Sequence, residues 1–257
     1  MLDFNNLKNQ DSDSQIVANE AAARALDLPD IASLPRPNPP HLAIVSGGNS
    51  ISKRVNALRN WRGDVWATNN AALWCVQHKI RCTMFSIDSS DKFNPEIRGN
   101  VKAAILSARC HPYLFGLLRE AKVAIFDLPP SELGPGSTAS ACLIATRFCG
   151  YTNITFFGCE GCYSNKQYAY DPIALEDPGI LVECNGEVFR TVHAWLFATR
   201  AIAYTIRQFP SKVSERSGGL LAAMVKSPDC RIVGISPQLA TPKTSKVLVD
   251  NYLAHVQ

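Results

Sequence analysis

Glycine, hydroxyl and amide residues follow several short apolar runs of this sequence, and such residues are well suited to bind phosphate or sugar. The first run, Leu42–Val45, is followed by Ser-Gly-Gly-Asn-Ser, and residues 51–60 are predicted to form a helix. Glycines let the backbone approach a phosphate closely, and the unpaired N–H groups at a helix start favour an anion. Strand, glycine turn and helix together form the phosphate site of an open α/β sheet. The predicted contacts in this turn are Gly47, Gly48, Asn49 and Ser50.

Similar polar residues follow the next predicted strands, 64–68, 81–88 and 153–158, and precede a helix predicted over 139–149. The carboxyl ends of parallel strands lie at one edge of a sheet, where ligands collect. Each motif alone is also an ordinary turn or helix cap, but their recurrence at successive strand ends favours one shared pocket. The residues expected there are Asn69, Asn70, Asp88, Gly136, Ser137, Thr138 and Glu160.

These residue types suggest roles around a nucleotide. Asn69 is suited to hydrogen-bond a ribose or a base, and the turn and helix start are suited to hold phosphates. Asp88 and Glu160 carry hard carboxylate oxygens that suit Mg²⁺ if the donor is ATP. His193 lies near the start of the longest predicted helix, 189–208, where it is placed to act as a general base; packing beside Trp195 is the commoner role of such a histidine.

Strands that alternate with helices predict an α/β, Rossmann-like fold with a mostly parallel sheet and helices on both faces. Residues 1–40 are expected to form an N-terminal helical arm and a Pro-rich connector that packs on the domain or on a neighbouring subunit of a homo-oligomer. Residues 41–237 form the predicted nucleotide-binding domain, with a lid-like loop over 159–188 and a last strand over 231–235. Residues 238–257 are expected to end in a helix.

Composition argues against several other functions. The net charge of +4 comes from scattered basic residues, which predicts no nucleic-acid surface. Neither a signal peptide nor an apolar run of ~18 residues is present, so we expect no membrane partner. Nine irregularly spaced cysteines suit a reducing compartment, and the predicted location is cytoplasmic. The Cys159–Cys162 pair has no second pair to complete a zinc site, because Cys184 stands alone. The first turn also lacks the third glycine of a dinucleotide fingerprint.

Three blocks of the sequence resemble one family. HLAIVSGGNSI resembles the opening strand and turn of the family that joins motility accessory factors to 6-hydroxymethylpterin diphosphokinase-like proteins. WATNNAALWCVQHKIRCTMFSID and GPGSTASACLIATRFCGYTNITFFGCE are similar to its later blocks, in the same order. The resemblance covers about residues 41–208 and implies nucleotide use. Asn49 replaces the usual proline and Glu160 the typical aspartate, which leaves the substrate open.

The same architecture resembles bacterial sialyltransferases that use a CMP-activated sugar. Tyr163, the segment 168–171 with Tyr168, and His193 follow the order of the catalytic residues in those enzymes. The resemblances therefore imply a transferase of one of two kinds. Diphosphate transfer from ATP to a pterin-like alcohol would use Asp88 and Mg²⁺, whereas glycosyl transfer from a CMP-sugar would use His193 and the tyrosines. The alternative is a non-catalytic nucleotide-binding or interaction protein of phage origin.

Overall fold

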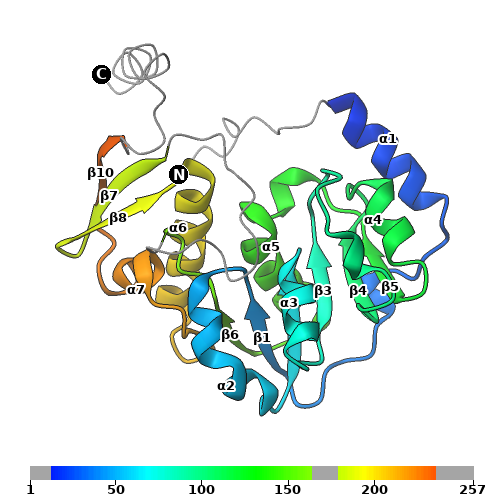
Figure 1. The fold of residues 1–257 in the computed structure, drawn as a ribbon, viewed down its shortest axis with the longest axis horizontal. Coiled ribbons are helices and arrows are strands. Elements are labelled where there is room, and N and C mark those ends of the chain that lie inside the picture. Colours follow the sequence, from blue (N-terminus) through cyan, green and yellow to red (C-terminus); the bar gives the residue numbers. More distant parts are fainter. Residues whose placement is uncertain (1–12, 164–178, 236–257) are drawn as a thin grey trace.

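A parallel sheet forms the centre of the protein in the computed structural model, which describes residues 13–163 and 179–235 (Figure 1). Its seven strands lie in the order β5-β4-β3-β2-β1-β6-β9, and all neighbouring strands run parallel. The prediction of an α/β, Rossmann-like fold is confirmed. The strands are β1 (His41–Val45), β2 (Asp64–Thr68), β3 (Thr83–Ser86), β4 (Ala103–Ser107), β5 (Lys122–Phe126), β6 (Asn153–Phe157) and β9 (Val213–Glu215).

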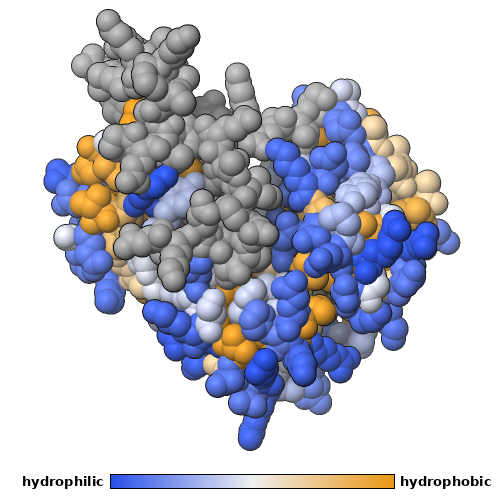
Figure 2. All heavy atoms as spheres, viewed as in Figure 1, coloured by the Kyte–Doolittle hydropathy of each residue, from blue (hydrophilic) through white to orange (hydrophobic). Residues whose placement is uncertain are grey.

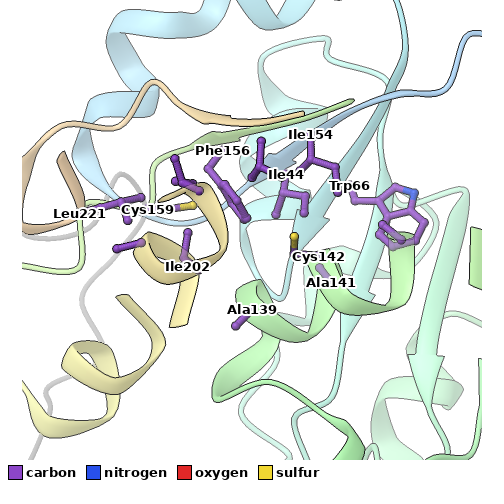
Figure 3. Packing of buried hydrophobic residues seen from close by; sticks show 14 of the residues in the cluster. Ile44, Trp66, Ala139, Ala141, Cys142, Ile154, Phe156, Cys159, Ile202 and Leu221 are labelled. Carbon is purple, nitrogen blue, oxygen red and sulfur yellow. The ribbon is translucent and has the colours of Figure 1, made fainter. Parts of the chain in front are cut away.

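Two apolar cores cover the two faces of this sheet. Successive strand residues point to opposite faces, so Leu42 and Ile44 pack in one core while Ala43 and Val45 pack in the other. The first core includes residues of α5 (Gly136–Ile144), α6 (His193–Gln208) and α7 (Gly219–Lys226), and Figure 3 shows part of it around Ile44. The second includes residues of α2 (Val55–Arg59), α3 (Ala71–Gln77) and α4 (Pro112–Leu117). Both faces therefore carry helices, as predicted.

Two helices around the predicted ligand edge differ from the prediction. The helix expected over 51–60 consists of a 3₁₀ segment, Asn49–Arg54, followed by the short α2. The helix expected over 139–149 begins earlier, at Gly136, and continues as a π-helix over Ala145–Cys149. Gly150 ends it with a φ of +82°, which is the left-handed conformation expected of a terminating glycine.

A second, antiparallel sheet was not predicted. It contains β7 (Ile180–Cys184), β8 (Glu187–Thr191) and β10 (Cys230–Ile235) in the order β10-β7-β8. The end of the predicted loop 159–188 is therefore a hairpin, and α6 begins at His193 rather than at 189. The last predicted strand lies in this sheet and not in the parallel one. Asn185 and Gly186 at the hairpin turn both have positive φ, as a tight two-residue turn requires.

A disulfide joins two strands of this small sheet. Cys184 of β7 pairs with Cys230 of β10, and the two residues are also partners in the strand register. The spacing of the cysteines did not indicate this pair, because Cys230 is brought beside Cys184 from 46 positions away.

The described part of the N-terminal arm, residues 13–40, packs on the domain. Helix α1 (Asp13–Arg24) contacts α4, and the connector continues along the edge strand, where the Ile125 N–H donates to the Pro29 carbonyl at 2.9 Å. Among the described helices, none has the length and apolar character needed to cross a membrane. Hydrophilic side chains predominate on the face shown in Figure 2, with smaller apolar patches between them. The terminal helix predicted within 238–257 lies outside the described residues.

Candidate functional site

The order of the strands defines where a ligand fits. The chain passes from β1 to β2 on one side, whereas β6 lies on the other side of β1 and is followed by β9. Connections therefore diverge beyond the carboxyl ends of β1 and β6, and this is the switch point at which open α/β sheets bind ligands.

Hydroxyl and amide side chains from three separate segments meet beside this switch point. Ser46 Oγ, directly after β1, lies 3.0 Å from Thr68 Oγ1 at the end of β2 and 2.5 Å from Thr138 Oγ1 in the first turn of α5. Ser137 Oγ donates to Asn69 Oδ1 at 3.3 Å. The structure thus brings together the predicted residues of the β2 end and the α5 start. Ser46 was not singled out from the sequence, although its place after an apolar strand is the signal that identifies it.

Backbone conformation at this cluster is unusual. Asn69 has a φ of +52°, which is uncommon for a residue with a side chain and is concentrated at functional positions. Gly136 opens α5 with a φ of +77°. The residue before it, Pro135, makes no side-chain cap to the helix. The first N–H groups of α5 lie beside the hydroxyl cluster, and no side chain at the N-cap position accepts a hydrogen bond from them. Because such N–H groups carry partial positive charge, they suit an anion.

The glycine turn after β1 already holds a carboxylate of the chain. Glu160 Oε1 accepts a hydrogen bond from the Ser50 N–H at 2.5 Å. A Cβ on Gly48 would lie 1.5 Å from Glu160 Oε2, so glycine is needed here for the carboxylate to fit. The Gly48 N–H donates to the Gly158 carbonyl at 2.8 Å. The predicted residues of this turn therefore do lie beside Glu160. However, the N–H groups of Gly48 and Ser50 already donate hydrogen bonds within the protein and are not available to a ligand.

Two buried polar atoms in this turn have no hydrogen bond. They are Glu160 Oε2 and Ser50 Oγ. The neighbouring Gly47 is buried, while Asn49 is half-buried. Because a carboxylate lies at the first turn of the 3₁₀ segment, a second anion bound there would meet like charge.

Asp88 and Asn70 form local contacts. Asp88 Oδ1 accepts from the Ser90 N–H at 3.1 Å, and Asn70 Oδ1 accepts from the Asn94 N–H at 3.3 Å. In residues 13–163 and 179–235, no group of three or more His, Cys, Asp or Glu side chains is arranged to hold a metal ion. Asp88 therefore offers Mg²⁺ one carboxylate, which requires phosphate and water oxygens to complete the shell.

Tyr163, one of the residues assigned to catalysis, packs against the first turn of α6. The centroid of the Tyr163 ring lies 4.8 Å from the centroid of the Trp195 ring. The guanidinium carbon of Arg190 also lies 4.8 Å from the centroid of the Tyr163 ring. The Tyr163 N–H donates to the Arg190 carbonyl at 2.8 Å, which fixes the loop after β6 to β8. His193 is the first residue of α6 and is half-buried. Tyr168 lies outside the described residues.

The second turn of α6 lies beside the start of α5. A Cβ on Gly136 would lie 4.0 Å from the Cβ of Ala198. His193 precedes Ala198 by five residues, which corresponds to about 7.5 Å along the helix and about 140° around its axis. The backbone of His193 is therefore near the start of α5, while its side chain leaves α6 on a different face from Ala198.

The Cys159–Cys162 pair does not have the character of a redox or metal site. Burial raises the pKa of the Cys159 thiol to about 12, and burial also raises the pKa of Cys162. Reactive cysteines have a lowered pKa instead. Cys159 Sγ donates to the Phe157 carbonyl, as a packed thiol does.

An open hollow of about 440 Å³ lies away from the strand ends, at the β7–β8 turn and the start of β10. Its lining includes Glu183, Asp229 and Arg231, and Arg231 pairs with Glu183 at 3.0 Å. The one cation of this lining is already paired, and Asp229 adds a negative charge that would repel a phosphate, so the polar cluster beside β1 is the stronger candidate site.

A scan against protein-family models finds no match to this chain, and searches of curated proteins and of solved structures find none either. The resemblances stated from the sequence remain predictions.

Proposed function

We propose that this protein is a nucleotide-dependent transferase that binds its donor at the carboxyl ends of β1, β2 and β6. The observation that carries the proposal is the hydrogen-bonded cluster of Ser46, Thr68 and Thr138, with Asn69 and Ser137 beside it. Small hydroxyl and amide groups next to a helix start suit phosphate and ribose oxygens. Asn69 is held in a strained conformation that orients its amide into this cluster.

The donor phosphates are assigned to the start of α5 and not to the first glycine turn. Glu160 already accepts the Ser50 N–H, and its charge would repel a phosphate in that turn. The α5 start carries Ser137 and Thr138, and Pro135 provides no competing side-chain cap. This assignment also puts the phosphates on the side of the sheet that faces α6.

Glycosyl transfer from a CMP-activated sugar is the reaction that the arrangement favours. His193 begins α6, and Tyr163 contacts Trp195 in the first turn of the same helix. In this reaction His193 takes the proton of an acceptor hydroxyl, whose oxygen bonds to the anomeric carbon as the bond to the phosphate breaks. The Tyr163 hydroxyl donates a hydrogen bond to the departing phosphate. Diphosphate transfer from ATP would depend on Asp88 instead.

A thermal-shift panel with ATP, CMP, CTP, GTP, UDP and NAD, each with and without Mg²⁺, tests nucleotide binding. A ligand that binds the folded state raises the melting temperature. We expect CMP and CTP to raise it most, and no shift with any nucleotide would contradict the proposal.

Two variants then separate the reactions. With a CMP-sugar donor, His193→Ala is expected to lower turnover by at least about 100-fold, the lower range for a lost general base, while Asp88→Asn retains it. The opposite pattern would assign diphosphate transfer. Nucleotide binding without any product would favour the non-catalytic alternative.

A further inference from the structure

Helix α1 lies across the carboxyl ends of three strands. Asn19 Nδ2 donates to the Ser89 and Arg109 carbonyls at 3.4 and 3.1 Å. Arg24 Nε donates to Asp127 Oδ2 at 2.8 Å. These three partners follow β3, β4 and β5 respectively, so α1 covers the ligand edge of the sheet on the side away from β6.

The contacts that hold α1 are mainly polar. Its buried residues are Ile16, Asn19 and Ala23, and only two of them are apolar. Glu20 pairs with both Arg24, at 3.4 Å, and Arg109, at 3.6 Å. The two buried apolar residues contribute little hydrophobic free energy, and the exposed pairs of Arg24 add little. The largely buried pair of Glu20 with Arg109 is therefore the contact that another anion must replace when α1 leaves the strand ends.

Arg109 is unusual among these residues. Its side chain is only 12% exposed, and its Nε lies in the interior without a hydrogen bond. The Glu20 carboxylate is 3.6 Å from that Nε, beyond the 2.7–2.9 Å of a charge-assisted hydrogen bond. Glu20 compensates the positive charge of Arg109, but the Nε–H group of the guanidinium donates no hydrogen bond. A carboxylate or phosphate that approached in the plane of the guanidinium would satisfy it.

We propose that Arg109 is a binding residue for an oxyanion, and that Glu20 is an internal carboxylate that occupies this position while α1 is docked. The ligand class is an anion with a carboxylate or phosphate group. Arg109 follows β4, which is two strand spacings, about 10 Å, from β2, whose end lies beside the α5 start assigned to the donor phosphates, so the two positions are separate. The inference goes beyond the proposed transferase and does not depend on nucleotide binding.

The experiment titrates inorganic phosphate and, separately, acetate into the full-length protein and its variants, and follows binding by NMR or calorimetry. Glu20→Gln is expected to bind phosphate at least tenfold more tightly than the unaltered protein, because the competing carboxylate is removed. In the same background Arg109→Gln is expected to abolish the gain, and Arg109→Lys to retain only part of it. Glu187→Gln on the exposed start of β8 is the control with the same charge change.

Hydrogen exchange of residues 13–24 supplies a second measurement. Phosphate is expected to increase exchange of α1 amides in the unaltered protein, since anion and Glu20 compete for Arg109. Tighter binding of phosphate than acetate would indicate a phosphorylated ligand, and comparable binding would indicate a carboxylate. Equal anion affinity in the unaltered protein, Glu20→Gln and Arg109→Gln would overturn the proposal and leave Arg109 as a docking residue for α1.

Discussion

Replacement of Glu160 by alanine tests whether its carboxylate is the resident anion of the first glycine turn. The substitution removes the hydrogen bond from the Ser50 N–H to a charged acceptor. Such bonds contribute about 1.5–3 kcal/mol, and the removal of the unpaired Oε2 offsets part of that loss. We therefore expect a loss of about 2 kcal/mol in the free energy of unfolding. This corresponds to a melting temperature lower by about 4–8 °C for a chain of this size.

Small anions are expected to restore part of the lost stability. Acetate at ten times its dissociation constant would add about 1.4 kcal/mol to the free energy of unfolding of Glu160→Ala. Differential scanning fluorimetry with acetate, against chloride at equal ionic strength, measures this. Glu187→Ala, an exposed change on β8, serves as the control and should show no rescue. An unchanged melting temperature in Glu160→Ala, or equal acetate effects in all three proteins, would refute the reasoning.

Two further predictions concern the same edge of the sheet and the core. Gly48→Ala is expected to destabilise the protein by about 1–3 kcal/mol, because its Cβ would lie 2.6 Å from the Gly158 carbonyl oxygen as well as against Glu160. In the Glu160→Ala background the destabilisation by Gly48→Ala should be smaller but still present. An unchanged midpoint of urea unfolding in Gly48→Ala would contradict this prediction. Burial raises the pKa of three thiols from 9.0 to about 12 in the folded protein. The unfolded chain therefore ionises first, and the free energy of unfolding falls between pH 9 and 12. Together these three thiols are expected to lower the free energy of unfolding by about 4 kcal/mol at pH 10 relative to pH 8. Urea unfolding at both pH values measures this, and an unchanged pH dependence in a triple alanine variant would contradict it. The thiols are Cys110, Cys142 and Cys159.

The parallel sheet was predictable because buried strands are continuous apolar runs. β2 has the predicted bounds, and β6 differs by one residue. The second sheet was missed because the polar composition of 159–188 suggested a loop. Buried Ile180, Val182 and Cys184 alternate with half-buried positions, and this alternation and the Asn185-Gly186 turn are the signals that identify the hairpin.

The composition of the site was predictable, but its internal contacts were not. Ser50 and Glu160 were both expected at the ligand edge, yet their hydrogen bond depends on β1 and β6 being neighbours in the sheet. Strand order is set by long-range packing, which the spacing of residues does not reveal. For the same reason the contact between Glu20 and Arg109, 89 positions apart, could not be foreseen.

The most direct test of the proposed site is calorimetric titration of CMP into Thr138→Val. The substitution keeps the shape of the side chain but removes the hydroxyl that contacts Ser46 at the start of α5. Thr146→Val, which removes a hydroxyl that bonds to the Cys142 carbonyl farther along the same helical segment, is the matched control. We predict that CMP binds the unaltered protein and Thr146→Val equally and binds Thr138→Val at least tenfold more weakly. Equal CMP binding by all three proteins, or by none, would contradict a nucleotide site at these strand ends.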